Sequence, residues 1–213
     1  MKEVIKLTAY TDAASYNNGK KIRNLPEHSA SAGIILFKDS IIASVSTYNP
    51  DSSISYGEML AIYNILNKCY WIATESNKCI KLILHSDSAY CVQAINEWLK
   101  GWKSRQKNGV WIKSTGEPVA YQSLISEIDT FINQTDELDI SIRHISGHID
   151  INNNKSMAKA MKVYKRFNNK QISNEELARH EVYNDLCDIY AKEVLKRGMM
   201  GEIDYERNIK FSK

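Results

Sequence analysis

Three strand-like runs lie in the first 48 residues, and the short gap between the second and the third constrains the fold most. In the first run, 4–11, apolar residues alternate with polar ones from Ile5 to Ala9, which is typical of a half-buried strand. The other two runs, 32–37 and 41–48, are apolar and contain several β-branched residues. Because only Lys38-Asp39-Ser40 separates them, they are expected to pair as a hairpin. The chain should therefore open with three antiparallel strands.

Helical and strand patterns alternate through the rest of the chain. An apolar stripe at helical spacing covers 57–73, and 79–85 is a short apolar run expected to be a buried strand. The remaining expected elements are a helix from the cap residues 86–88 to about Leu99, a helix from Pro118 to about Phe131, a strand over 138–145, and a last helix from the capping box Ser173…Glu176 to about Arg197, stopped by Gly198. This order predicts an α/β (α+β mixed) fold, with helices packed on a five-stranded mixed sheet.

The composition is that of an ordinary globular protein. The chain has 213 residues, of which 43% are hydrophobic and 25% charged, and no apolar run is long enough to cross a membrane. The first residues lack the apolar core of a signal peptide, so we expect a cytoplasmic protein. The four cysteines show no CxxC spacing and are expected to be reduced thiols.

The net charge of +3 conceals two strongly basic segments. No acid occurs between Trp98 and Gly116, and none between Ile151 and Asn174. The cations of these segments are Lys100, Lys103, Arg105, Lys107 and Lys113 in the first, and Lys155, Lys159, Lys162, Lys165, Arg166 and Lys170 in the second. Such segments are candidates for contact with a polyanion.

Four carboxylates occupy positions that do not help to build a fold. Asp12 and Asp87 are expected at the ends of apolar strands, Glu58 in the first turn of an apolar helix, and Asp188 inside the last helix. Carboxylates that converge from strand ends and helices would suit Mg²⁺, which takes oxygen ligands and keeps several waters. Each also has an ordinary explanation: a turn for Asp12, a helix cap for Asp87, the helix dipole for Glu58 and an exposed helix surface for Asp188.

Six motifs in order give the chain a resemblance to the type 1 ribonuclease H family. They are Tyr10-Thr11-Asp12-Ala13-Ala14-Ser15, Gly57-Glu58-Met59-Leu60-Ala61, His85-Ser86-Asp87-Ser88-Ala89-Tyr90-Cys91-Val92, Trp98-Leu99-Lys100-Gly101-Trp102-Lys103, Ile145-Ser146-Gly147-His148 and Asn184-Asp185-Leu186-Cys187-Asp188-Ile189-Tyr190-Ala191. The resemblance spans about Ile5 to Leu195. It implies the ribonuclease H-like fold and cleavage of the RNA strand of an RNA–DNA hybrid.

The resemblance also implies roles for the acidic residues. Asp12, Glu58, Asp87 and Asp188 would hold two Mg²⁺ ions, with Mn²⁺ as an alternative, and Asp12 would bridge the two ions. His148 would be the family's mobile histidine, which assists proton movement or product departure.

Asp185 is a rival for the role of Asp188. Asn184 and Asp188 are four residues apart and share a helix face, as the family's Asn and Asp do. We therefore favour Asp188 as the metal ligand and expect Asn184 to contact the substrate.

The tryptophan-rich basic segment resembles the basic protrusion with which the family grips the DNA strand. Phosphates would meet its cations, and its indole rings could pack on sugars or on each other. An amphipathic helix with core tryptophans is the alternative. The residues expected to contact the hybrid are Trp98, Lys100, Trp102, Lys103, Arg105 and Lys107.

Several positions depart from the family pattern. Ala13 replaces a usual glycine, and Ala89 replaces a frequent glutamine. The asparagines that usually read the hybrid before the helical glutamate are replaced by Ile54, Ser55 and Tyr56. Strict hybrid recognition is therefore in question. Ser15 and Ser55 are candidates to substitute as substrate contacts.

The largest departure is the distance from His148 to Asp188, which is forty residues. We expect an insertion at about 150–183 that forms a small extra helix near the mouth of the active site. The expected organisation is one ribonuclease H domain over 1–198 with this insertion, followed by a C-terminal tail over 199–213.

Two other functions remain possible from the sequence. One is another nuclease of the same superfamily, such as a junction resolvase, although the basic tryptophan-rich segment argues against it. The other is a non-catalytic hybrid-binding module, although a polyanion binder should not retain four clustered carboxylates. The oligomeric state is not fixed by the sequence, and a monomer is expected.

Overall fold

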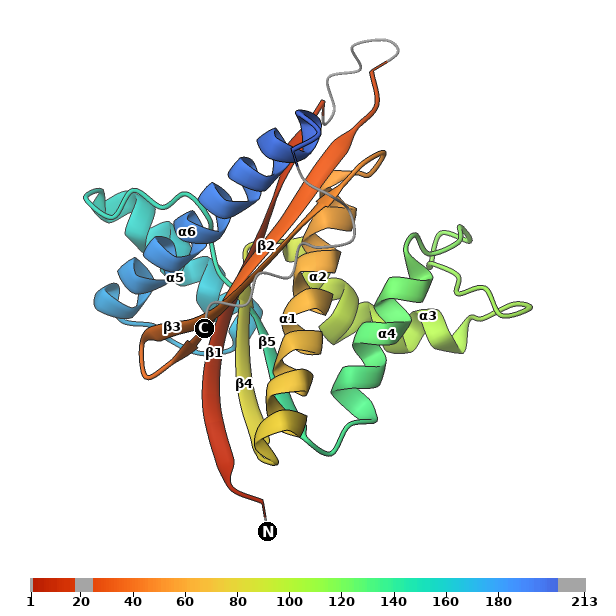
Figure 1. Cartoon of the computed structure of the whole chain (residues 1–213), viewed down its shortest axis with the longest axis horizontal. Helices are drawn as coiled ribbons and strands as arrows, with labels where there is room; N and C mark the ends of the chain where they lie inside the picture. The colour runs from red at the N-terminus through yellow and green to blue at the C-terminus, as the bar shows by residue number, and fades with distance from the viewer. Residues whose placement is uncertain (1, 18–24, 203–213) are drawn as a thin grey trace.

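Five strands form one mixed sheet in the computed structural model, which describes residues 2–17 and 25–202 (Figure 1). The strands are β1 (Val4–Tyr16), β2 (His28–Phe37), β3 (Ser40–Asn49), β4 (Cys79–Ser86) and β5 (Leu138–His144), in the sheet order β3-β2-β1-β4-β5. β1, β2 and β3 pair antiparallel, whereas β4 runs parallel to both β1 and β5. The predicted mixed sheet with three antiparallel strands at its start is confirmed.

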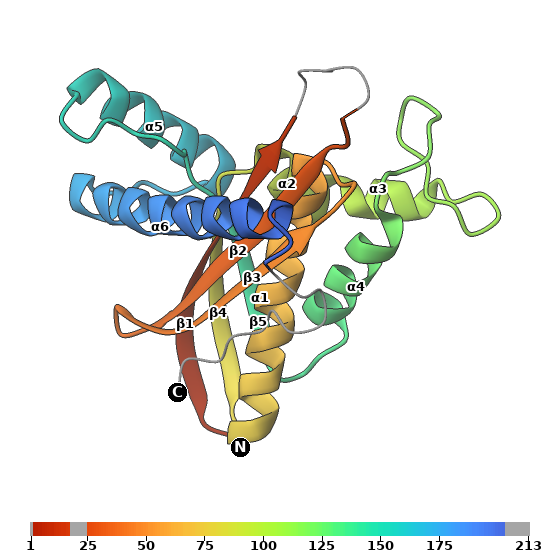
Figure 2. The same cartoon turned by 45° about the horizontal axis from the view of Figure 1, so that its top comes forward.

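Helices cover both faces of this sheet (Figures 1 and 2). They are α1 (Ile54–Ser76), α2 (Ala89–Gln93), the π-helical segment η1 (Ala94–Trp98), α3 (Leu99–Ser104), α4 (Gln122–Asn133), α5 (Asn154–Asn168) and α6 (Asn174–Met199). α1 packs on one face with α4 against it, and α6 crosses β1, β2 and β3 on the other. Within the described residues, no helix combines the length and apolarity needed to span a membrane.

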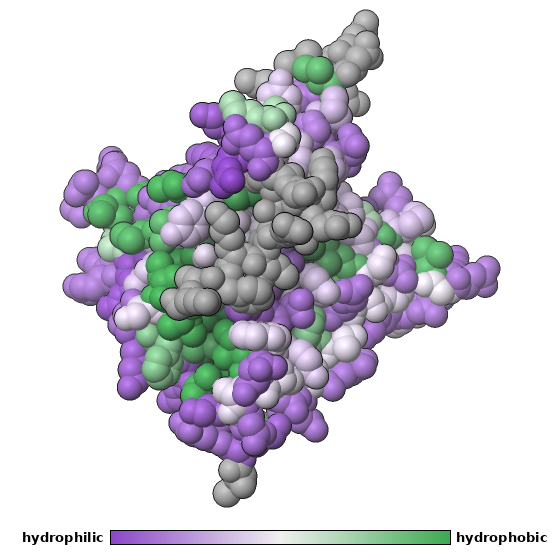
Figure 3. Space-filling view, viewed as in Figure 1, coloured by the Kyte–Doolittle hydropathy of each residue, from purple (hydrophilic) through white to green (hydrophobic). Residues whose placement is uncertain are grey.

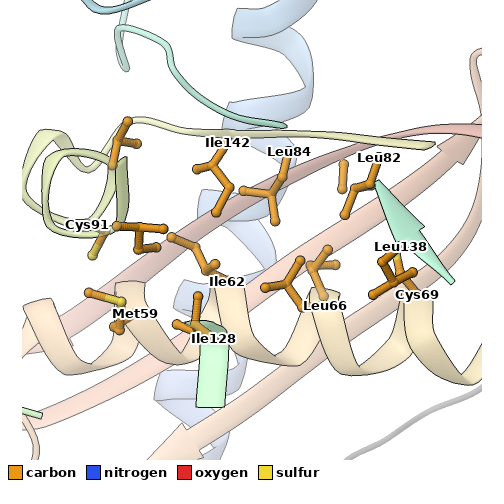
Figure 4. Close-up of a cluster of buried hydrophobic side chains, with 14 of the residues drawn as sticks. Met59, Ile62, Leu66, Cys69, Leu82, Leu84, Cys91, Ile128, Leu138 and Ile142 are labelled. Carbon is orange, nitrogen blue, oxygen red and sulfur yellow. The ribbon is translucent and has the colours of Figure 1, made fainter. Parts of the chain in front are cut away.

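Buried side chains of β1 point to both faces of the sheet, so this strand contributes to the hydrophobic clusters on both sides. Leu7 and Ala9 belong to the cluster under α1, whereas Tyr10 belongs to the cluster under α6. Figure 4 shows Ile62 and Leu66 of α1 in the first cluster, together with Leu82, Leu84, Ile142 and other buried side chains. Burying an aliphatic side chain of this size contributes roughly 1.5–3 kcal/mol, so this cluster holds α1 firmly on the sheet.

The extra helix expected within 150–183 is present as α5. Its apolar face buries Met157, Ala160 and Tyr164. At the start of α6, the Ser173 hydroxyl accepts a hydrogen bond from the backbone N–H of Glu176, as expected for a capping residue. The four cysteines are free thiols, as predicted, and three of them are buried.

Several predicted boundaries were wrong; β2, for example, starts at His28 and not at 32, and α1 starts at Ile54 and not at 57. β1 continues five residues beyond Thr11, because Asp12 to Tyr16 still pair with β2. The helix expected to start at Pro118 starts at Gln122 instead, since Pro118 pairs with Ile112 in an isolated bridge. α6 passes through Gly198 and ends at Met199, and residues 203–213 of the expected tail lie outside the described part of the chain.

Gly198 is a packing position, not a helix stop. A Cβ atom there would lie 2.2 Å from the ring of Tyr48. We expect Gly198→Ala to lower the free energy of unfolding by about 1–3 kcal/mol, because overpacking outweighs the better helix propensity of alanine. Urea unfolding would measure this loss of stability. Gly101→Ala is the matched control, since its Cβ would meet only the flexible end of Arg105, and it should be neutral or stabilising by up to about 1 kcal/mol.

Candidate metal centre

Asp12 and Asp87 meet because two parallel strands stop pairing at the same level. The last pair between β1 and β4 is Thr11 with Ser86, so the two aspartates are the next residues on each strand. Asp87 follows the end of β4, as predicted. Asp12 does not end its strand, because β1 continues in the pairing with β2, but it lies beyond the part of β1 that β4 covers.

The other two carboxylates approach from opposite faces of the sheet. Glu58 lies on α1, which starts at Ile54, so Glu58 is in the second turn and not in the first as predicted. The hydroxyl of Ser88, the N-cap of α2, donates a hydrogen bond to Glu58 Oε2. Asp188 comes from the middle of α6 on the other face. We call Asp12, Glu58, Asp87 and Asp188 the edge cluster.

Electrostatics shows that the edge cluster is one coupled group. Burial, followed by the charges of Asp87, Asp188 and Glu58, raises the pKa of Asp12 to about 8. Burial also raises the pKa of both Glu58 and Asp87. A divalent cation would stabilise the ionised forms, and a set of carboxylate oxygens fits the ligand preference of Mg²⁺.

Three neighbours fix the position of Asp87. Asn184 Nδ2 donates to Asp87 Oδ2 at 3.3 Å, and His144 Nε2 lies 3.1 Å from the Asp87 carbonyl oxygen. A Cβ at Gly147 would lie 2.3 Å from Asp87 Oδ2, so only glycine allows this close approach. Asn184 is fully buried. Its enclosed side chain positions Asp87, and its contact with the substrate stays a prediction.

His148 lies beside the edge cluster, as expected from its motif. It is exposed, adopts a left-handed backbone with φ of 54°, and its charge lowers the pKa of Asp87. The next residue, Ile149, donates its N–H to Glu181 Oε1 on α6 at 2.6 Å. Burial raises the pKa of Glu181 to about 7. The loop that carries His148 is thus attached to α6.

Sequence reasoning missed two functional contacts. Lys192 Nζ donates to Asp188 Oδ2 at 2.5 Å, and this bond raises the pKa of Lys192. The four-residue spacing of this pair was the available signal. His144 was also missed, since it looked like a strand residue, and nothing local indicated its bond to Asp87.

The basic protrusion separates into buried and exposed parts. Trp102 is 4% exposed in the main core, and Lys103 pairs with the buried carboxylate of Asp129 at 2.5 Å. The Trp102 ring is therefore part of the core, and its contact with the hybrid stays a prediction. Trp98 is partly buried and lines a cavity of about 610 Å³. The exposed cations available to a ligand are Lys100, Arg105 and Lys107.

Ser15 and Ser55 remain accessible. Ser15 lies near the end of β1 opposite Ser29, and Ser55 lies in the first turn of α1; both are half-buried. Beside Ser55, the Tyr56 ring packs edge-on against Tyr121 and lines a second cavity of about 410 Å³. Both serines stay candidate substrate contacts.

Comparison with known proteins identifies the family. A family model described as RNase H matches residues 5–166, which is well over half of the chain. The chain therefore belongs to the RNase H family. The match includes Asp12, Glu58, Asp87 and His148, and it ends within α5, before α6 and Asp188.

Individual relatives match shorter stretches. Ribonuclease H1 of Mus musculus is 40% identical over 68 residues, which are 32% of this chain and 21% of that protein. Ribonuclease H of Chromobacterium violaceum is 33% identical over 72 residues, or 34% of this chain and 45% of that protein. The match therefore spans less than half the length of these curated relatives.

Solved structures share the fold at low identity. A foamy viral protease–reverse transcriptase, solved in complex with an RNA/DNA hybrid, aligns with a TM-score of 0.59 at 16% identity, covering 90% of this chain and 20% of that one. LC9-RNase H1, a type 1 RNase H with the type 2 active-site motif, aligns with a TM-score of 0.54 at 15% identity, covering 82% and 81%. These likenesses show the fold.

The raised pKa of Asp12 predicts how stability depends on pH without metal. The folded state keeps this proton up to about pH 8, whereas an unfolded chain releases it near 3.8. Between these values the folded state binds more protons, so the free energy of unfolding should fall as pH rises. In EDTA, the free energy of unfolding of Asp12→Asn should fall less from about pH 5 to about pH 8 than that of the unmodified chain. Asp139→Asn, which removes an exposed carboxylate paired with Lys81, should behave as the unmodified chain. Equal pH slopes for Asp12→Asn and the unmodified chain would contradict the coupling.

Proposed function

We propose that the protein is a metal-dependent endonuclease that hydrolyses the RNA strand of RNA–DNA hybrids. The observation that carries the proposal is the edge cluster, in which Asp12 and Asp87 are neighbours at the end of the β1–β4 pairing and share raised pKa values with Glu58. Membership of the RNase H family supports the reaction class.

Different residues of the chain would perform different parts of the reaction. Two divalent cations, Mg²⁺ or alternatively Mn²⁺, would supply an activated water and neutralise phosphate charge. Asp12 would bridge them, Glu58 and Asp87 would complete the ligands of one, and Asp188 would serve the other. His148, which is exposed beside Asp87, would move a proton to or from the reacting oxygens. Lys192 binds Asp188 and would keep a positive charge near the phosphate.

The hybrid is the substrate that the surface favours. Lys100, Arg105 and Lys107 are exposed on the protrusion formed by α3 and the loop after it, and hydrophilic residues cover much of that side in Figure 3. Ser15 and Ser55 would contact the hybrid near the edge cluster, where the family's asparagines are absent. The resolvase-like alternative would require cleavage of double-stranded DNA, and the non-catalytic alternative would require no cleavage at all.

A gel assay with labelled substrates separates these functions. In Mg²⁺ we expect cleavage of the RNA strand of a hybrid, little cleavage of double-stranded RNA or DNA, and none in EDTA. Asp188→Asn should reduce the rate severely, because Asp188 belongs to the edge cluster, whereas Asp185→Asn should reduce it mildly. Preferential cleavage of double-stranded DNA, or near-native activity of Asp12→Asn, would refute the assignment.

Salt dependence of hybrid binding tests which basic surface grips the substrate. Each phosphate contact contributes about −0.9 to the slope of log K against log salt for B-DNA, and a hybrid should be similar. Changing Lys100, Arg105 and Lys107 to Gln should flatten this slope by up to roughly two to three units. The matched triple change of Lys159, Lys162 and Lys165 on α5 should do the same if the insertion also contacts phosphates. If only the α5 variant flattened the slope, the protrusion would not be the hybrid grip.

A further inference from the structure

A second group of ligating side chains lies beside the edge cluster but shares no residue with it. One ligand atom each from His148, Glu181 and Asp185 lies within 4.8 Å of the other two. Among residues 2–17 and 25–202, this is the one group of three or more His, Cys, Asp or Glu side chains that meets this separation. It is therefore the most compact candidate cation site in the part of the chain that the structure describes.

α6 and the loop after β5 build this group together. Glu181 and Asp185 are four residues apart on α6, so their side chains share one face of the helix. The hydrogen bond from the Ile149 N–H to Glu181 Oε1 fixes the loop to that face at 2.6 Å. His148 is the residue before Ile149, so this bond keeps its ring next to the two carboxylates.

One buried carboxylate oxygen of Glu181 lacks a hydrogen-bond partner among the described residues. Glu181 is only 7% exposed, and the atom without a partner is its Oε2. A buried carboxylate oxygen without a partner destabilises the ionised form. A cation held jointly with His148 and Asp185 would supply the missing partner.

We propose that His148, Glu181 and Asp185 form a Zn²⁺ site that is separate from the edge cluster. The imidazole suits Zn²⁺, whereas Mg²⁺ takes oxygen ligands, so the two sites differ in the ions they favour. One histidine and two carboxylates give three protein ligands, which leaves the fourth tetrahedral position to water.

Zn²⁺ at this site would restrain His148. Its ring would serve as a ligand and could no longer move protons beside Asp87. Zn²⁺ should therefore inhibit cleavage in the presence of excess Mg²⁺, and Asp185→Asn should relieve the inhibition. This consequence rests on the proposed function, whereas the binding of Zn²⁺ does not.

Calorimetric titration of Zn²⁺ into the full chain, in excess Mg²⁺, tests the binding directly. We expect one Zn²⁺ per chain, retained in a double variant with Asp12→Asn and Glu58→Gln. Loss of even an outer partner of a metal ligand costs 10–100-fold in affinity, so Glu181→Gln or Asp185→Asn should weaken binding at least about tenfold. Asp185 is exposed, so Asp185→Asn should fold even if Glu181→Gln does not.

Glu193→Gln is the matched control. It removes an exposed carboxylate of the same helix, 3.9 Å from Arg197, and should bind Zn²⁺ as the unmodified chain does. Absence of Zn²⁺ binding would overturn the proposal. So would binding that survives Glu181→Gln and Asp185→Asn, or binding that is lost only when Asp12 and Glu58 are changed, which would place the ion in the edge cluster. None of these results depends on whether the protein cleaves a hybrid.

Discussion

The parallel pairing of β1 with β4 determines where the site can form. Both strands are buried in the centre of the sheet, and their pairing ends at Thr11 and Ser86. The next residue on each strand is an aspartate, so two carboxylates are brought to one point by the backbone ladder itself. No side-chain contact between them is required, and their like charges repel when both are ionised.

The packing and hydrogen bonds around the edge cluster offset the repulsion between its carboxylates. Burial, together with the charges of Asp87, Asp188 and Glu58, raises the pKa of Asp12 to about 8, so the metal-free fold disfavours the fully ionised cluster. Asn184 and Lys192 offset part of the charge through bonds to Asp87 and Asp188. Both residues lie on α6, whose buried Leu177 and Cys187 fix it on the sheet. Core packing on that face thus maintains an arrangement that electrostatics alone would disperse.

The sequence predicted the order of the elements along the chain, the mixed sheet, and the places of Asp87 after a strand and of Asp188 inside the last helix, because periodicity and spacing are local signals. It did not predict that β1 continues past Asp12, because it placed the start of the next strand at 32, whereas β2 starts at His28 and pairs with β1 up to Tyr16. Trp102 looked like a ligand contact because its neighbours are basic, but its ring lies in the core. A tryptophan beside cations has the same local sequence pattern whether its ring packs in the core or contacts a ligand. Only the tertiary packing distinguishes these two roles.

The segment 150–183, which the sequence analysis expects to be an insertion, is connected to the metal centre through the backbone of His144. Asn168, the last residue of α5, accepts from the His144 N–H at 3.1 Å and donates to its carbonyl oxygen at 2.7 Å. The Phe167 ring stacks on the His144 ring at 4.1 Å, and His144 Nε2 lies 3.1 Å from the Asp87 carbonyl oxygen. A continuous set of contacts therefore runs from the end of α5 to the strand end that carries Asp87. Because the same segment leads into α6, the insertion helps to place Asp87 and brings Glu181 to the loop of His148. The thirty-nine residues between His148 and Asp188 thus contribute to the geometry of the site as well as to the length of the chain.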